Sequence, residues 1–171
     1  YHNKEDEPAE TGYFEKAWFK PIPIVENGKQ TMQGLSYGMT AWRHGEEAMD
    51  PFHDEVGYLL WEVATGQIMR CFAVPRGIAL LAGGSAKAGD KILHFKAEPG
   101  SSSYGLVQNK YLLERARLGT FESVFTFNDD GTFGYTSDLV LELAATGKSM
   151  HHTDRNTLHR TKRISHSVAD A

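Results

Sequence analysis

Histidine is the residue type in this chain with the greatest capacity for chemistry. The 171 residues include eight histidines but only one cysteine, Cys71. Near pH 7 a neutral imidazole has a lone pair available for a transition metal, and a hydrogen bond to its other nitrogen can fix the ring. A single thiol excludes an intramolecular disulfide and any site built from several thiolates. The sequence therefore favours histidine as a metal ligand or as an acid–base group.

The adjacent pair His151 and His152 follows a turn at Thr146-Gly147 and begins the segment that we expect to be the last strand. Neighbouring residues of a strand point to opposite faces, so only one of these imidazoles can face the interior of a β-structure. The inward histidine is either a metal ligand or a structural residue, and both interpretations stay open at this point. Neither a His-x-His nor a His-Glu-x-x-His spacing occurs, so a zinc site is not indicated.

A third histidine, His53, suggests a general base, because Asp54 and Glu55 follow it directly. Successive strand residues diverge, so neither carboxylate can be assumed to reach the imidazole. The chain has no nucleophile elbow, no phosphate-binding loop and no dinucleotide-binding fingerprint, which excludes the enzyme classes that depend on these motifs.

The elements that must position these histidines are predicted to be antiparallel strands. Turn signals recur at short intervals and separate segments rich in aromatic, β-branched and aliphatic residues, as in hairpin-connected sheets. These signals are Asn27-Gly28, Thr65-Gly66, Gly89-Asp90, Asp130-Gly131 and Thr146-Gly147. No long segment carries the apolar stripe of a helix, which disfavours a parallel α/β sheet. We expect one short helix, around residues 109–116.

The clearest predicted hairpin joins residues 121–127 to residues 132–144. Aromatic and aliphatic side chains of one parity alternate with polar side chains of the other in both segments, and a turn with the sequence Asn-Asp-Asp-Gly separates them. A period of two gives one apolar and one polar face. The inner aromatic face fits either a sandwich core filled by its own side chains or a barrel that surrounds a ligand.

Composition narrows the class of protein. A chain of this length with 40% hydrophobic residues fits a single domain, residues 1–171. A net charge of −4 without a basic run argues against nucleic acid as a partner. The absence of a long apolar stretch and of a signal pattern argues against a membrane, and the single thiol fits a cytoplasmic location. Because the chain begins at Tyr1 in a polar run, we expect a missing first strand, together with a frayed tail at about 165–171.

Three blocks of the sequence together resemble the nitrobindin-type heme-binding β-barrel proteins, in the bacterial branch often labelled fatty-acid-binding-protein-like. The resemblance covers roughly residues 13–163. The blocks are Phe52-His53-Asp54-Glu55-Val56-Gly57-Tyr58-Leu59-Leu60-Trp61-Glu62, Ala73-Val74-Pro75-Arg76-Gly77 and His151-His152-Thr153-Asp154-Arg155-Asn156-Thr157-Leu158. The resemblance implies an all-β, antiparallel up-and-down barrel of about ten strands, similar to lipocalins, with at most one or two short helices. It also implies one b-type heme, held by a histidine of the last strand beneath an apolar distal side.

Carried over residue by residue, the resemblance assigns the iron to His152, or alternatively to His151, and places His53 beside the heme. Members of the family bind nitric oxide, and some isomerise peroxynitrite to nitrate. The chain departs from the family pattern in two ways. It lacks the N-terminal Gly-x-Trp-x-Gly motif, and Thr153 stands where the family has leucine after the ligand. A slip of one residue in the register of the last strand would turn the histidine outward.

Two other functions compete with heme binding. The first is a metal-free carrier of a fatty acid or another small hydrophobic ligand, whose carboxylate would pair with Arg70, Arg115 or Arg117 if one points inward. The second is an enzyme that acts on an organic substrate with His53 as base. In every case the expected partner is one small hydrophobic or planar ligand. If the chain assembles with a second copy, we expect a homodimer.

Overall fold

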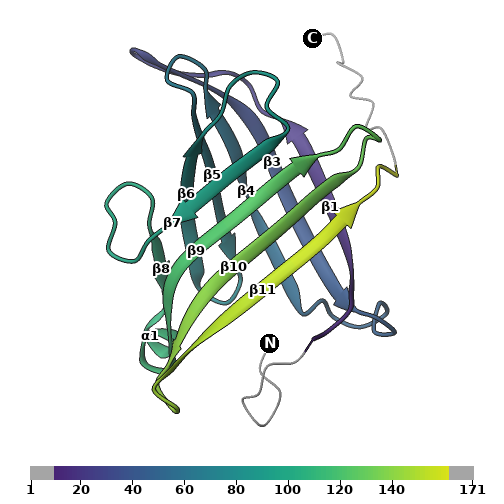
Figure 1. Cartoon of the computed structure of the whole chain (residues 1–171), viewed down its shortest axis with the longest axis vertical. Coiled ribbons are helices and arrows are strands. Elements are labelled where there is room, and N and C mark those ends of the chain that lie inside the picture. Colours follow the sequence, from purple (N-terminus) through teal and green to yellow (C-terminus); the bar gives the residue numbers. More distant parts are fainter. Residues whose placement is uncertain (1–9, 162–171) are drawn as a thin grey trace, which may run out of the picture.

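An antiparallel sheet that curls around an interior makes up most of the chain (Figure 1). The computed structural model describes residues 10–161. The strands are β1 (Tyr13–Pro21), β2 (Val25–Asn27), β3 (Gln30–Arg43), β4 (His53–Glu62), β5 (Gln67–Val74), β6 (Ile78–Ser85), β7 (Ile92–Ala97), β8 (Leu106–Gln108), β9 (Ala116–Phe127), β10 (Phe133–Leu143) and β11 (Lys148–Leu158). One short helix, α1 (Lys110–Arg115), lies between β8 and β9.

The strands pair in the order β1-β3-β4-β5-β6-β7-β9-β10-β11, with β2 added to β3 and β8 added to β6. Every pair is antiparallel. This single continuous sheet favours the barrel-like alternative over a two-sheet sandwich. It confirms the predicted all-β antiparallel class, and α1 confirms the predicted short helix. The Asn109 side chain caps that helix by accepting a hydrogen bond from the backbone N–H of Leu112 at 3.0 Å.

The predicted turns are confirmed by glycines in a conformation that other residues adopt only with strain. Gly66 has φ +74° between β4 and β5, and Gly147 has φ +63° between β10 and β11. Each donates its backbone N–H to the last residues of the preceding strand, Gly66 to Glu62 at 2.9 Å and Gly147 to Leu143 at 2.8 Å. Because glycine lacks a Cβ, it closes these tight connections at little cost and so fixes the strand register.

Aromatic side chains fill a large part of the interior. Phe125 is fully buried, and its ring packs edge-on against Phe95 at 5.3 Å and Phe133 at 5.0 Å between centroids. The predicted two-residue alternation of β9 and β10 is therefore confirmed, since Phe121 and Tyr135 are also buried. Phe127 differs, because it lies at the end of β9 and is 42% exposed. Such edge-to-face packing adds to the burial of apolar area.

The two terminal strands of the sheet, β1 and β11, approach each other where the start of β1 meets the end of β11 (Figure 1). Within residues 10–161 no backbone ladder joins them. Side chains bridge the gap instead: the Tyr13 hydroxyl donates to the backbone oxygen of Arg155 at 3.1 Å, and the Asn156 amide donates to Glu15 at 3.0 Å. We call this β1–β11 junction the seam. The expected strand before Tyr1 stays a prediction, and the expected frayed tail at 165–171 lies outside the described residues.

Candidate functional site

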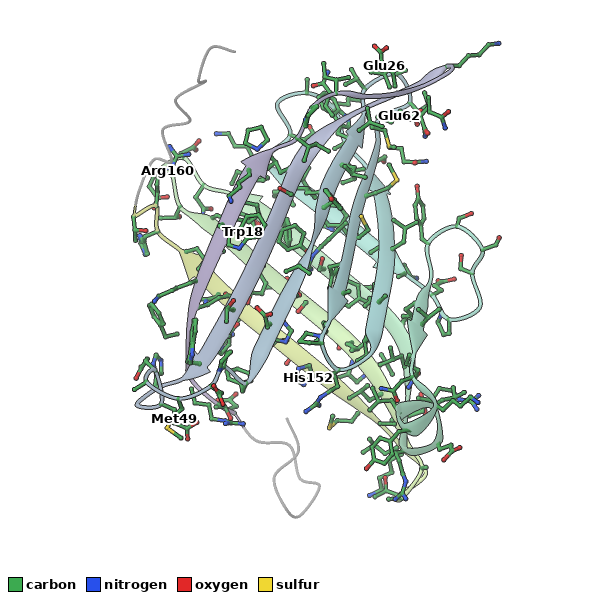
Figure 2. The ribbon with its side chains drawn as sticks, turned by 180° about the vertical axis from the view of Figure 1, so that it is seen from behind. Trp18, Glu26, Met49, Glu62, His152 and Arg160 are labelled. Carbon is green, nitrogen blue, oxygen red and sulfur yellow. The ribbon has the colours of Figure 1, made fainter. Side chains whose placement is uncertain are left out.

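His152 faces the interior from β11. Its partner across the β10–β11 ladder is Leu139, which packs against the hydrophobic core. Residues directly opposite each other in an antiparallel pair share a face of the sheet, so the His152 imidazole is on the core side. Its side chain is 37% exposed, and it lies toward the end of the barrel that also holds Met49 (Figure 2).

His151 points the other way, as the alternation of a strand requires. Its imidazole is on the outer face, where Nδ1 lies 2.8 Å from a carboxylate oxygen of Asp138 on β10. The side chain is 63% exposed. Of the two histidines that the sequence left as alternatives, His152 is thus the one on the interior face.

The wall beside His152 is apolar. Leu139 lies opposite His152, and Phe121 on β9 lies opposite Leu139. The Phe121 ring packs edge-on against Phe72 of β5, with 5.7 Å between centroids. Met150, two residues before His152, shares its face of β11. One imidazole next to aliphatic and aromatic side chains is the donor set and the kind of wall that a heme takes in proteins.

A carboxylate accompanies the interior histidine. Asp154, two residues along β11, shares the inner face, and its Oδ2 lies 3.4 Å from His152 Nε2. The matching pair on the outer face is His151 with Asp138. The strand therefore carries two histidine–carboxylate pairs, one on each side of the barrel wall.

His53 is the first residue of β4 and also belongs to the interior. Its Nε2 lies 3.4 Å from Glu55 Oε2, whereas Asp54 faces outward and accepts a hydrogen bond from Thr40 at 2.8 Å. The carboxylate two residues away is the one that reaches the imidazole, because every second residue of a strand shares a face. Burial acts to lower the pKa of His53, but the hydrogen bond and the charge of Glu55 outweigh it and leave the pKa raised.

The interior is not uniformly apolar, because a buried arginine crosses it. Arg70 on β5 is 4% exposed. Nη2 donates to Glu55 at 2.7 Å, Nε to the Tyr37 hydroxyl at 3.0 Å and Nη1 to the Ser123 hydroxyl at 3.2 Å. Its guanidinium also lies 4.5 Å from the centroid of the Phe72 ring. Burial acts to raise the pKa of Glu55, but the charge of Arg70, together with the hydrogen bonds and charge of His53 and Arg70, outweighs it and holds the pKa at about 2.

The ion pair between Arg70 and Glu55 was not predicted from the sequence. It occupies the arginine that was expected to bind the carboxylate of a fatty acid. Three N–H groups of the Arg70 guanidinium already donate to protein groups, and its charge is paired with Glu55, so a ligand carboxylate would have to compete with Glu55 for it. Arg115 and Arg117 are exposed. None of the three arginines named for the carrier interpretation is therefore available inside the barrel.

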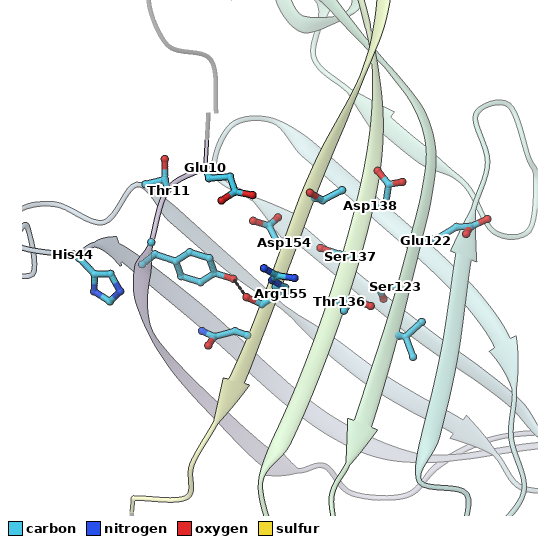
Figure 3. A pocket seen from close by; sticks show the side chains of 15 residues that line it. Glu10, Thr11, His44, Glu122, Ser123, Thr136, Ser137, Asp138, Asp154 and Arg155 are labelled. Carbon is cyan, nitrogen blue, oxygen red and sulfur yellow. Dashed lines mark hydrogen bonds between the residues drawn. The ribbon is translucent and has the colours of Figure 1, made fainter. Parts of the chain in front are cut away.

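A second polar cluster lies at the seam. The Tyr135 hydroxyl donates to Glu15 at 2.9 Å, and the hydroxyls of Tyr13 and Tyr135 are 2.9 Å apart. Figure 3 shows the adjoining hollow of about 790 Å³, with Tyr13 hydrogen-bonded to the Arg155 backbone. Side chains from both sides of the seam line it, among them Tyr13, Ser123, Ser137, Asp154 and Asn156.

Replacing Glu15 by glutamine is expected to stabilise the protein above pH 7. Burial raises the pKa of Glu15, and hydrogen bonds from Asn156 and Tyr135 oppose this only in part. The contribution of the carboxyl group to the free energy of unfolding is therefore complete below its unfolded pKa and is lost as pH rises through the folded pKa. Thermal unfolding should place Glu15→Gln above wild type at pH 8 and level with it at pH 3.5.

The control for this measurement is Glu114→Gln, at an exposed position of α1, which should follow wild type at both pH values. A wild type more stable than Glu15→Gln at pH 8 would contradict the prediction, since it would mean that the ionised carboxylate holds the seam together.

Comparison with known proteins assigns the family. The family model described as a THAP4-like, heme-binding beta-barrel domain matches residues 3–160. The chain belongs to this family. The THAP4-like heme-binding family is the one that the three sequence blocks resemble, so the predicted family is confirmed. No curated protein sequence matches the chain.

A solved structure agrees with the fold of the THAP4-like family member described here. The crystal structure of Rv2717c from M. tuberculosis superposes with a TM-score of 0.56 and 16% sequence identity, over 89% of this chain and 82% of that chain. At this level of identity the likeness concerns the fold. Within residues 10–161, no three side chains of His, Cys, Asp or Glu are grouped to hold a metal ion, and no helix has the length and apolar character of a membrane span.

Proposed function

We propose that this chain binds one b-type heme inside the barrel, with His152 as the axial ligand of the iron. The observation that carries the proposal is the position of His152, on the interior face of the last strand beside the apolar side chains of Leu139 and Phe121. The family match supports heme as the group. His151 is on the outer face and His53 lies in the interior on β4, which leaves His53 as a pocket residue and not the ligand.

When bound, the heme would supply an iron able to coordinate a small ligand, with His152 as the residue that would hold the iron. The residues of the chain would do the rest: Phe72, Phe121 and Leu139 would exclude water from the porphyrin faces, and His53, held by Glu55, would offer a polar group near the mouth. We propose nitric oxide as the ligand and isomerisation of peroxynitrite to nitrate as the reaction, following the family resemblance. The iron provides the chemistry and the barrel provides the binding and the dry surroundings.

The metal-free carrier remains the second candidate, but the interior favours heme. A fatty-acid carrier needs a buried cation for the carboxylate, and Arg70 is neutralised by Glu55 at 2.7 Å. A heme needs an imidazole and an apolar wall, both of which are present at His152. The presence of bound heme iron would distinguish the heme protein from the metal-free carrier.

The deciding experiment is a titration of the full-length protein with hemin, followed by absorption. We expect a Soret band that saturates at one hemin per chain, and a shift of that band when nitric oxide is added to the loaded protein. The control is the same titration of heat-unfolded protein, which should give no saturable band. A featureless titration, combined with saturable binding of a fluorescent fatty acid, would overturn the proposal in favour of the carrier.

A further inference from the structure

We propose that the outer face of β1, β3 and β4 is a docking surface for a membrane that contains anionic lipids. The face carries large apolar side chains where a sheet that faces solvent usually carries polar ones. Phe14, Trp18, Val56 and Tyr58 are between 40% and 55% exposed. Contiguous exposed apolar side chains of this kind mark a site of interaction with a protein or a membrane. The inference goes beyond the proposed function, because it concerns the outside of the barrel.

The strand register gathers these residues into one surface. Residues directly opposite each other in an antiparallel ladder share a face of the sheet, so the outward side chains of β1, β3 and β4 form rows across the three strands. The rows are Phe14–Trp42, Lys16–Thr40–Asp54, Trp18–Gly38–Val56 and Lys20–Ser36–Tyr58. We call these rows the outer aromatic face.

The Trp18 indole lies against the backbone of β3. A Cβ atom at Gly38 would come within 2.6 Å of Trp18 Nε1 and within 2.9 Å of two further ring atoms, so the ring can rest there because position 38 has no side chain. Trp18 is thus held on the protein while it remains 40% exposed. An aromatic ring in this position suits the boundary between lipid head groups and acyl chains, where tryptophan and tyrosine are enriched.

Two lysines alternate with the aromatic residues along β1. With a spacing of two, the outward positions of this strand are Phe14, Lys16, Trp18 and Lys20. The Lys16 ammonium lies 5.4 Å from the centroid of the Trp42 ring, and the Lys20 ammonium lies 5.0 Å from the centroid of the Trp18 ring. A lysine whose stem runs along an apolar surface keeps its ammonium in a polar layer while its neighbours enter an apolar one.

The charge of the outer aromatic face selects an anionic partner. Its rows contain Lys16 and Lys20 against one carboxylate, Asp54, which accepts a hydrogen bond from Thr40 at 2.8 Å. This face is therefore positive, although the chain has a net charge of −4. Anionic lipids attract lysines close to a membrane surface, and the same membrane takes up the aromatic rings between them.

Docking on a lipid surface needs neither the long apolar stretch nor the signal pattern whose absence argued against a membrane. It would also affect the interior of the barrel. Because β1 forms one side of the seam, a docked molecule would hold the junction between β1 and β11 close to the lipid. Apolar molecules dissolved in the lipid would then reach the protein beside that junction.

The test is co-flotation of the full-length protein, without hemin, with vesicles of phosphatidylcholine alone or mixed with an equal part of phosphatidylserine. We expect wild type to bind the mixed vesicles more tightly than the neutral ones, and to be released as the salt concentration rises. Lys16→Gln/Lys20→Gln should weaken binding about thirtyfold, because each lysine close to an anionic surface contributes about fivefold. Trp18→Ser should weaken binding by at least about fivefold through the loss of apolar area.

Two variants on other parts of the barrel serve as matched controls. Lys91→Gln/Lys96→Gln removes the same charge from lysines that are 59% and 52% exposed beside and on β7. Tyr111→Ser removes an aromatic ring that is 67% exposed on α1. Both variants should bind the mixed vesicles as wild type does.

Wild type that fails to bind the mixed vesicles would overturn the inference. Equal losses in the two lysine double variants would also overturn it, because net charge and not this face would then govern binding. Binding to oligothymidylate in place of vesicles would identify single-stranded nucleic acid as the occupant, and a dimer that Trp18→Ser dissociates, without vesicle binding, would identify a second copy. Both results reject the lipid. Val56→Ser replaces Trp18→Ser if circular dichroism shows that the latter does not fold.

Discussion

His152→Ala is expected to abolish saturable hemin binding. The alanine removes the imidazole that faces the interior from β11, and no other histidine of that strand shares its face. Loss of a hydrogen-bond partner of a metal ligand typically weakens binding by roughly 10- to 100-fold, so loss of the ligand itself should exceed that. Hemin titrations followed at the Soret maximum measure the effect, with circular dichroism to verify the fold.

His151→Ala is the matched control for this substitution. It removes an imidazole of the same strand, but one that contacts Asp138 on the outer face, so hemin affinity should stay at the wild-type value. Full retention of hemin affinity in His152→Ala would refute the assignment of the ligand. Loss of affinity in His151→Ala alone would mean that the bound state uses the other register of β11.

Arg70→Met should lower the free energy of unfolding by about 3–5 kcal/mol, the usual result of removing one partner of a buried ion pair. The variant leaves the Glu55 carboxylate buried, at 4% exposure, without its cation. It also removes the donors to Tyr37 and Ser123. Urea unfolding at pH 7 measures the change from the shift in midpoint at constant slope.

The double variant Arg70→Met/Glu55→Gln tests the cause. Once the carboxylate is gone, a methionine side chain in the same volume should restore at least half of the lost stability, because burying an ion pair contributes little net free energy. Arg117→Met, at an exposed position of β9, should change stability by less than about 0.5 kcal/mol. Equal destabilisation of the single and the double variant would show that packing around Arg70, and not the unpaired charge, determines the loss.

The sheet could be predicted from the sequence because its signals are local. Turn glycines such as Gly66 and Gly147 must adopt positive φ, and a strand such as β10 shows its period of two within its own residues. The short helix is likewise a local event, since Asn109 supplies its cap within the same segment. Each of these features depends on residues only a few positions apart.

The interior contacts were predictable only in part, because they depend on register. Whether His151 or His152 faces inward is decided by the pairing of Leu139 with His152, which a one-residue slip would reverse. The Arg70–Glu55 pair requires the β4–β5 ladder to be known. The contact between His53 and Glu55 follows from the sequence once both are placed on one strand, because residues two apart share a face.

The seam makes the barrel wall unequal in strength around its circumference. Separating any two neighbours along the path from β1 to β11 breaks a backbone ladder, whereas parting β1 from β11 breaks hydrogen bonds such as that between Asn156 and Glu15. A typical hydrogen bond of this kind contributes about 1 kcal/mol. We therefore expect local opening to require little free energy at this junction, which makes the junction between β1 and β11 the expected route by which a flat molecule enters the interior.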